Sequence, residues 1–511
     1  MNPEQNKYYV IGIDLGTSSC KTVVMNLSGQ ILGLGSNGYP ANDIHSKWEE
    51  QNPDGLLKAT ILSVRKAIKT ARVSRNDCIG ISVGGALHSL IALDIDDRPL
   101  TGVMTWADNR ATDQVASLRQ SQDMHFHYLQ SGCPNHPMYP LSKIVWLREK
   151  RSDLFKQISW FISAKEYLLL KLTGQHLVDF SIASGTSLLN VKKLIWDSKA
   201  LEIAGIQSQQ LSELCHPNTI LELMNSDLTT EIGLLPKTPV IIGSSDATNS
   251  NLGVGAVHQD QLTCMVGTSG AIRKITKQPI LDSKERTWCY VVDPDHWLVG
   301  GAINNGGLAL QWLQHALGQG IGEKSLSTAP SIDDLLLWAE QVEPGADGLI
   351  CLPFFTNERS PNWNPNARAV FYGLTFQHDQ RHMARAVLEG IGYRLLTVLE
   401  VLDEIAGQSN ELRASGGYTQ SPFWLQLTAN ILNRKLLTTE NHESSAVGAA
   451  YWAMIGNDLI DGLESIGDLA GTPTIYEPDL LIQDIYKISF QTYQDLYRQL
   501  KGLFDKTAPL L

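Results

Sequence analysis

Two copies of one hairpin pattern constrain the fold of this chain more than any other feature. Residues 10–25, VIGIDLGTSSCKTVVM, form an apolar run, a Gly-Thr-Ser turn and a second apolar run. Residues 261–280, QLTCMVGTSGAIRKITKQPI, repeat that order. Apolar runs on both sides of a short glycine-containing turn predict a β-hairpin. Because the pattern recurs in the second half of the chain, the sequence predicts two related domains.

The two copies differ at one chemically important position. Aligning Gly16-Thr17-Ser18 with Gly267-Thr268-Ser269 places Asp14 against Met265. Glycine allows close approach of backbone amides to phosphate oxygens, and threonine and serine hydroxyls donate further hydrogen bonds. One such turn is most often an ordinary hairpin. Its repetition, with an acid in only one copy, favours a phosphate clamp.

The surrounding sequence predicts an α/β fold. Apolar runs at 8–15, 20–27 and 31–36 predict three strands, with a turn at 27–30. Residues 54–71 carry an apolar helical stripe, and 78–85 predict another strand. Strand, helix and strand in this order indicate layered α/β structure. A second long apolar helix is predicted at 383–405.

The predicted domains are 1–255, with the first phosphate hairpin, and 256–511, with the second. The boundary lies in the glycine-rich stretch 251–257, NLGVGAV. Ligands are expected to lie between two domains of this kind.

Composition excludes several classes of function. The chain has 511 residues, 43% hydrophobic and 18% charged, which is typical of a globular protein with more than one domain. Its formal net charge of -12 disfavours nucleic acid and anionic lipid as partners. Seven scattered cysteines indicate neither a zinc cluster nor a disulfide framework. The N-terminus lacks the layout of a secretion signal and no apolar run is long enough for a membrane helix, so the expected compartment is the cytoplasm.

A lone acid follows an apolar strand in residues 240–255, VIIGSSDATNSNLGVG. Asp246 lies at the end of that strand among small polar residues, where a carboxylate can accept a proton from a bound hydroxyl. The alternative, equally weighted, is that Asp246 caps the helix that follows.

Two loops concentrate hydrogen-bonding side chains, GGALHS at 84–89 and TWADNR at 105–110. His88, Trp106, Asp108 and Arg110 form a set of donors, acceptors and an aromatic ring suited to a polyhydroxylated ligand. Each residue alone is explained as well by ordinary packing or a surface ion pair. Further on, Gly416-Gly417 in ASGGYTQSPFW would let a flat ring lie against bare backbone, although a plain turn before a helix is an equal alternative.

Together these segments resemble the FGGY family of carbohydrate kinases. The resemblance rests on GIDLGTSSCK, WADNR, IIGSSDATNSNLG, MVGTSGAIR, GADGLICLPFFTNERSPNWNP, ASGGYTQSPFW and ESSAVGAAYWA. Within the family, LHSLIALD, TWADNRA, HPMYPLSKI and INNGGLALQWL are most similar to the gluconate kinases. The resemblance implies duplicated actin-like ATPase domains of the ribonuclease H-like type, with a cleft between them.

The resemblance also implies residue roles. Asp246 would be the catalytic base and a sugar contact, and Asp14 would hold magnesium. The residues expected to face the transferring phosphate are Gly16, Thr17, Ser18 and Lys21, with Gly267 and Thr268 on the opposite side of the nucleotide. The expected adenosine and inner-phosphate site comprises Gly307, Gln311, Gly416, Gly417 and Ser421. The expected sugar ligands are His88, Trp106, Asp108 and Arg110.

The function expected from this resemblance is transfer of the γ-phosphate of ATP, with Mg2+, to the terminal hydroxyl of D-gluconate. A carboxylate substrate needs nearby cations, and the candidates are Arg110, His88, His136 and Lys143. Two alternatives stay open, a kinase for xylulose or another pentulose or polyol, and an actin-like nucleotide switch that binds a protein. A homodimer is compatible with the sequence.

Overall fold

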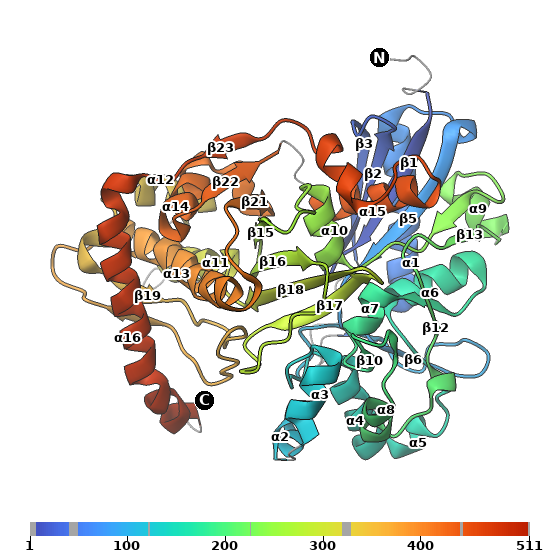
Figure 1. Cartoon of the computed structure of the whole chain (residues 1–511), viewed down its shortest axis with the longest axis horizontal. Coiled ribbons are helices and arrows are strands. Elements are labelled where there is room, and N and C mark those ends of the chain that lie inside the picture. The colour runs from blue at the N-terminus through green and yellow to red at the C-terminus, as the bar shows by residue number, and fades with distance from the viewer. Residues whose placement is uncertain are drawn as a thin grey trace. The chain divides into compact units, whose positions relative to one another are not determined.

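In a computed structural model, the chain forms two compact units (Figure 1). The structure describes residues 7–39, 50–120, 123–224, 226–318, 329–439 and 443–508. The first unit comprises Met1–His258, Ile275–Val299 and Glu443–Gly471, and the second comprises Gln259–Lys274, Gly300–His442 and Thr472–Leu511. The chain thus first leaves the first unit close to the predicted boundary at residue 255, but two later segments also belong to the first unit.

A six-stranded sheet forms the centre of the first unit, in the order β13-β14-β5-β1-β2-β3. The neighbours β1–β2 and β2–β3 are antiparallel, whereas β1–β5 and β14–β5 are parallel. The three N-terminal strands therefore confirm the first predicted hairpin. The bounds are β1 (Tyr9–Leu15), β2 (Ser19–Asn26), β3 (Ile31–Gly38), β5 (Cys78–Gly85), β13 (Ile220–Glu222) and β14 (Pro239–Ile241).

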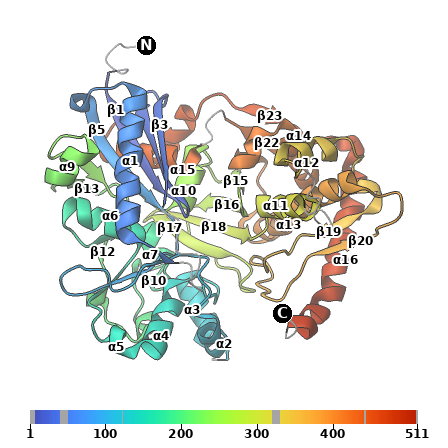
Figure 2. The ribbon, with the colours of Figure 1, turned by 180° about the vertical axis from the view of Figure 1, so that it is seen from behind.

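Helices cover both faces of this sheet (Figure 2), with α1 (Pro53–Ala71) on one face and α10 (Asp246–Gly253) and α15 (Ser444–Gly456) on the other. Helix α1 begins where the Asn52 side chain accepts hydrogen bonds from two amides of the first turn. On the opposite face, a Cβ at Gly12 of β1 would lie 2.0 Å from the Ala446 carbonyl oxygen of α15. Glycine is therefore required for the close approach of α15.

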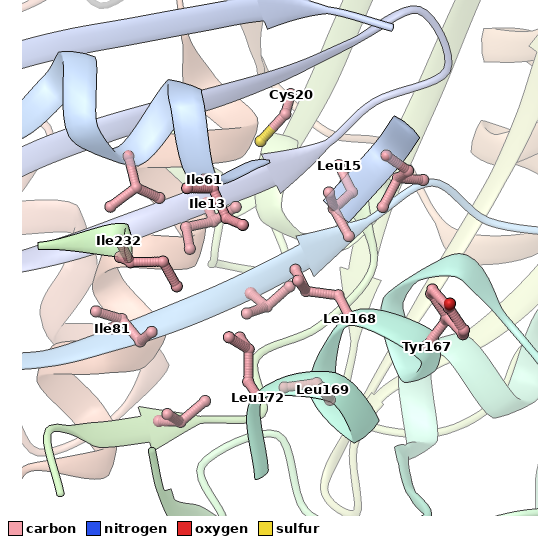
Figure 3. Packing of buried hydrophobic residues seen from close by; sticks show 14 of the residues in the cluster. Ile13, Leu15, Cys20, Ile61, Ile81, Tyr167, Leu168, Leu169, Leu172 and Ile232 are labelled. Atoms are coloured by element: carbon pink, nitrogen blue, oxygen red, sulfur yellow. The ribbon is translucent and has the colours of Figure 1, made fainter. Parts of the chain in front are cut away.

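The core of the first unit lies between the sheet and helices α1 and α6 (Ala164–Thr173). Figure 3 shows Ile13 of β1, Ile61 of α1 and Ile81 of β5 in this cluster, with Leu168 and Leu169 of α6. All five side chains are at most 4% exposed. The stripe predicted on α1 thus faces the core, because apolar residues three and four positions apart share one face of a helix.

The second unit repeats the strand order of the first. Strands β18, β16, β15, β21, β22 and β23 are consecutive neighbours in its sheet. The β15–β16 pair is antiparallel, and β15–β21 and β21–β22 are parallel, as are the equivalent pairs around β1. The predicted duplication is confirmed. The bounds are β15 (Gln261–Val266), β16 (Gly270–Thr276), β18 (His296–Ile303), β21 (Glu411–Ser415), β22 (Lys435–Thr438) and β23 (Thr474–Tyr476).

The long predicted helix is α13 (Gln380–Ala406), which begins at the N-cap Asp379. The other helices of the second unit are α11 (Gly307–Gly318), α12 (Ile332–Glu340), α14 (Pro422–Leu432) and α16 (Gln483–Thr507), and a two-stranded sheet pairs β19 (Ile350–Leu352) with β20 (Val370–Tyr372). Among the described residues, none of the helices combines the length and hydropathy needed to cross a bilayer.

Short elements complete the first unit. Its remaining strands are β4 (Glu50–Gln51), β6 (Ile91–Leu93), β7 (Val103–Met104), β8 (Trp160–Ile162), β9 (Leu177–Asp179), β10 (Leu189–Asn190), β11 (Ile195–Trp196) and β12 (Glu213–Cys215). Its remaining helices are α2 (Thr112–Arg119), α3 (Asp123–Ser131), α4 (Pro140–Lys150), α5 (Ser152–Phe155), α7 (Phe180–Ser184), α8 (Ser198–Ala204) and α9 (Ser226–Ile232). Strand β17 (Trp288–Asp293) falls within the segment 275–299 and is the edge strand of the seven-stranded sheet, next to β18. The seven cysteines are free thiols.

Candidate active site

The carboxyl ends of three parallel strands meet at one edge of the first unit's sheet. Leu15 at the end of β1 pairs with Gly85 at the end of β5, and Gly85 bridges to Ser245 after β14. This register brings together Asp14, the loop after β5 that carries His88, and Asp246. Ligands of open α/β sheets bind at the carboxyl ends of the strands.

Asp14 is a buried carboxylate with an unsatisfied oxygen. Asp14 is only 9% exposed, and within the described part of the chain its Oδ1 has no hydrogen-bond partner. Burial raises its pKa to about 7, the nearby Asp246 and Glu443 carboxylates add to that shift, and Lys21 opposes it. An acid in this environment is suited to a cation, because a cation supplies the compensation that the protein leaves out.

Asp246 is the first residue of α10, and the residue before it caps the helix. Ser245 Oγ accepts a hydrogen bond from Thr248 N at 3.2 Å, so the hypothesis that Asp246 itself is the N-cap is wrong. Asp246 Oδ1 instead accepts from the amides of Leu87 at 3.3 Å and Ala247 at 2.8 Å. Its carboxylate thus lies at the positive end of the α10 dipole and beside the His88 loop.

The first predicted phosphate hairpin is exposed at its tip. Gly16 N donates to Ser19 O at 3.1 Å, and Thr17 and Ser18 are both exposed. Lys21 lies opposite Asp14 in the β1–β2 register. Its Nζ forms an ion pair with Glu443, 2.7 Å from a carboxylate oxygen. These residues therefore present amides, hydroxyls and one cation close to Asp14. Glu443 is a partner that the sequence did not reveal.

Side chains from the 105–110 loop and from strand β4 hold the tip of this hairpin. The indole Nε1 of Trp106 donates to Thr17 Oγ1 at 3.0 Å, and Gln51 Nε2 donates to the Thr17 carbonyl. Because the hydroxyl oxygen of Thr17 accepts from the indole, its own proton is directed elsewhere and can be donated to a ligand.

His88 is held in a strained backbone conformation. Its φ of 68° lies in the left-handed region, which costs a non-glycine residue roughly 1–2 kcal/mol. Its Nδ1 lies 2.7 Å from the Gly185 carbonyl oxygen and its Nε2 lies 3.4 Å from the Tyr290 hydroxyl. Since a carbonyl only accepts, Nδ1 carries a proton, and in the neutral ring Nε2 is an acceptor. The Tyr139 ring packs against the imidazole edge to face at 4.9 Å.

Asp108 and Arg110 form a buried ion pair within the 105–110 loop. Arg110 Nε lies 2.9 Å from both oxygens of Asp108, and its Nη2 lies 2.6 Å from Asp108 and 2.6 Å from Glu50. The Arg110 side chain is only 2% exposed. Burial alone would lower its pKa, but Asp108 and Glu50 raise it overall. Arg110 therefore orders the loop, and Glu50, an acid at the start of β4, is a member of the cluster that sequence reasoning missed.

The second hairpin and the start of α11 come together in the second unit. Gly267 N donates to Ser269 O at 2.8 Å, and Gly307 N donates to Gly267 O at 2.7 Å. The turn is one residue shorter than the first, because Val266 pairs with Gly270 whereas Leu15 pairs with Cys20. Leu308 N donates to Thr268 O at 3.2 Å, so the helix N-terminus lies against the turn.

The double glycine after β21 lies beside the same turn. Gly416 has a φ of 95°, and a Cβ there would lie 2.5 Å from the Val266 carbonyl oxygen, whereas a Cβ at Gly417 would meet open space. Ser421 is the N-cap of α14 and its Oγ accepts from Trp424 N at 3.2 Å. Gln311 is exposed on α11, one turn after Gly307. The structure thus gathers Gly267, Thr268, Gly307 and Gly416, and gives Ser421 a capping role of its own.

Protein ligands alone do not form a metal cage in the part of the chain that the structure describes. Among the described residues, no group of three His, Cys, Asp or Glu side chains could hold a metal ion. Magnesium is commonly bound through one or two carboxylates together with substrate phosphates and water. The unsatisfied carboxylate oxygen of Asp14 fits that mode of binding.

Two family models match most of the chain. The models described as "FGGY family of carbohydrate kinases, N-terminal domain" and "C-terminal domain" match residues 9–253 and 262–456. The chain is 36% identical to a gluconokinase of Bacillus subtilis, over 97% of this chain and 96% of the relative. It is 28% identical to a xylulose kinase of the same organism, over 97% and 98%.

Two solved structures from Lactobacillus acidophilus resemble the whole chain. A structure described as gluconate kinase superposes with a TM-score of 0.90 at 32% identity, over 98% of this chain and 99% of that one. A structure described as ligand-bound xylulose kinase gives a TM-score of 0.91 at 33% identity, over the same shares.

Proposed function

The chain belongs to the FGGY family of carbohydrate kinases, and from this premise we propose that it phosphorylates the terminal hydroxyl of D-gluconate with ATP, giving 6-phosphogluconate. The observation that carries the choice of sugar is the full-length identity of 36% to a gluconokinase, against 28% to a xylulose kinase. The alternative of a nucleotide switch that binds a protein has no support from these matches.

The acceptor hydroxyl would be activated by Asp246. Its carboxylate, directed by the Leu87 and Ala247 amides, would take the hydroxyl proton as the oxygen bonds to the γ-phosphorus. The bond between that phosphorus and the bridging oxygen breaks, and ADP leaves. Phosphoryl transfer needs mainly positioning and charge stabilisation, so one base beside an ordered acceptor loop is adequate chemistry.

The nucleotide phosphates would bind to the turn residues of the hairpins. In the first unit Gly16, Thr17 and Ser18 would donate amides and hydroxyls, and Lys21 would supply a positive charge after leaving Glu443. In the second unit the ligands would be the turn residues Gly267 and Thr268, with Gly307, Gln311, Gly416, Gly417 and Ser421 around the rest of the nucleotide. Asp14 would hold magnesium, which when bound offsets the negative charge of the phosphates.

Recognition of the sugar would fall to His88 and Trp106, with Asp108 and Arg110 ordering the loop. Of the four candidates for the substrate carboxylate, Lys143 is 0% exposed and Arg110 is bound to two acids. His136 Nδ1 accepts from Met138 N at 3.2 Å, so in the neutral ring Nε2 is the nitrogen that carries the proton. We therefore assign the carboxylate contact to His136, and expect the acceptor Nε2 of His88 to face a sugar hydroxyl instead.

The test is a panel of acceptors in an ADP-release assay, with D-gluconate, D-xylulose, D-ribulose and glycerol. We expect gluconate to have the highest kcat/KM. Xylulose is the second candidate, because a structure described as a xylulose kinase is as similar to the chain as the gluconate kinase. If a neutral sugar exceeds gluconate tenfold, the gluconate proposal is wrong and the kinase family assignment is unaffected. ATP turnover that no sugar stimulates would also contradict it.

A further inference from the structure

The lysine at position 143 lies in the first turn of α4, behind the sugar loops. It is 0% exposed, and its Nζ donates to the carbonyl oxygens of His88 at 2.8 Å and Thr105 at 2.6 Å. These two carbonyls belong to the two loops that carry the proposed sugar ligands. One ammonium group therefore joins both loops from within the protein.

The ammonium continues a connection that the backbone begins. Leu90 and Met104 exchange two backbone hydrogen bonds, 3.0 Å from Leu90 N to Met104 O and 2.9 Å in the reverse direction. His88 lies two residues before this bridge and Thr105 one residue after it. Beyond the bridge, Lys143 connects the two segments again, so it restrains their separation beside His88 and Trp106.

The same contact acts on the strained residue of the site. The His88 carbonyl that binds Lys143 belongs to the residue whose φ is 68°. A left-handed non-glycine residue persists only where its surroundings hold it. Helix α4 supplies two such restraints, the Lys143 ammonium on the backbone and the ring of its N-cap Tyr139 on the imidazole at 4.9 Å.

A buried lysine is an unfavourable residue for a purely structural position, because its ammonium group loses its hydration. Burying an ammonium group is unfavourable unless its partners compensate, and apolar side chains of similar volume often give equal or better stability. Its burial lowers the Lys143 pKa to about 7, and Asp108 and Arg110 act on it in opposite directions. The position thus favours loop geometry over core stability.

We propose that Lys143 is a positioning residue for the sugar acceptor, which locks the His88 and Trp106 loops in register through the two carbonyls. This inference rests on the proposed sugar kinase activity, but not on which sugar is the substrate. Lys143 does not contact the substrate and acts through His88 and the 105–110 loop.

The chain contains a matched control in the second unit. Lys274 is 4% exposed, and its Nζ donates to the carbonyls of Ala406 at 2.9 Å and Gly407 at 2.8 Å. Lys143→Met and Lys274→Met therefore each remove a buried ammonium that binds two backbone carbonyls. They differ in whether those carbonyls belong to the sugar loops.

The experiment measures KM for the best acceptor of the panel, KM for ATP and the melting temperature of both full-length variants. For Lys143→Met we expect an increase in the acceptor KM, or a loss of kcat/KM for the acceptor, of about 10-fold or more, the scale of losing one or two buried hydrogen bonds. Its KM for ATP should stay within about twofold. Lys274→Met should keep both KM values, while its melting temperature falls to a similar extent.

A second variant, Lys143→Gln, keeps a neutral donor with shorter reach and should show an intermediate acceptor KM. Equal effects of the two methionine variants on the acceptor KM would overturn the proposal. Failure of both Lys143 variants to fold would also count against it, because Lys143 would then serve the core. Absence of wild-type turnover on every sugar would instead refute the proposed function, so the two failures are distinguishable.

Discussion

Removing the charge of Asp14 should make the metal-free protein more stable while abolishing its activity. The carboxylate is buried, has an oxygen without a partner, and lies near Asp246 and Glu443. Asp14→Asn keeps the shape of the side chain and deletes the buried charge. The corresponding residue of the second hairpin, Met265, shows that the fold itself does not require an acid at this position.

The magnitude follows from the pKa of Asp14, which burial raises from 3.8 to about 7. Once Asp14 is ionised in both the folded and the unfolded protein, a pKa difference of this size lowers the free energy of unfolding by roughly 4 kcal/mol. The folded-state pKa is the higher one, so the stability contributed by this group is fully present below pH 4 and is lost as the pH rises through 7. Between pH 5 and pH 8 the wild type should therefore lose roughly 3 kcal/mol relative to the variant.

The assay is thermal unfolding in EDTA at pH 5 and pH 8. A change of 1 kcal/mol shifts the melting temperature by roughly 2–4 °C in domains of 150–250 residues, so we expect Asp14→Asn to melt at least about 4 °C above the wild type at pH 8. The gap should shrink at pH 5. Magnesium with a non-hydrolysable ATP analogue should also narrow it at pH 8, because the ligand stabilises only the protein that binds it.

A second acid provides a control of opposite sign. Burial would raise the pKa of Asp282, but hydrogen bonds from Arg286 lower it overall. Asp282→Asn should therefore melt below the wild type at pH 8. If Asp14→Asn also melts at or below the wild type, with a gap that does not depend on pH, Asp14 serves the scaffold and the metal hypothesis fails.

Three further outcomes are expected. Asp246→Asn should lower kcat by about 100-fold or more with little change in ATP affinity, the usual scale for a lost general base, and an unchanged kcat would exclude that role. Trp106→Phe removes the indole donor to Thr17 and should cost about 3- to 10-fold in kcat/KM, as one hydrogen bond is worth; no change would mean that Thr17 needs no such support. Gly448→Ala should destabilise the protein by more than about 1 kcal/mol, because the new Cβ would lie 2.0 Å from the Asn249 carbonyl oxygen. The control variant Gly417→Ala should leave the melting temperature unchanged, because a Cβ there meets open space. Equal melting temperatures of the two variants would refute the packing argument.

Much of the fold could be predicted from local patterns. The first hairpin, helix α1 and helix α13 all have the type and approximate bounds that apolar periodicity indicates. These elements are predictable from the sequence because each buries one face along its own length. The repeated Gly-Thr-Ser turn identified the duplication, although the second turn is one residue shorter, since the register of a hairpin depends on pairing along both strands.

Partners that come from distant parts of the chain were not predictable in this way. Lys21 pairs with Glu443, His88 with Tyr290, and Arg110 with Glu50. The segments 275–299 and 443–471 join the first unit although they lie beyond its predicted boundary. A local apolar pattern indicates which face of an element is buried, but it does not indicate which other element packs against that face.

The amino-acid sequence alone determined the α/β repeat, the acid in one hairpin and the family to which the chain belongs. These properties depend on residue type and spacing, which are written along the chain. Tertiary structure decided the chemical state of the key groups. Arg110 and Lys143 read as available cations, but folding placed one between two acids and the other between two carbonyls. Charge and hydrogen-bonding capacity depend on desolvation and on neighbours in space, and only the packed chain supplies both.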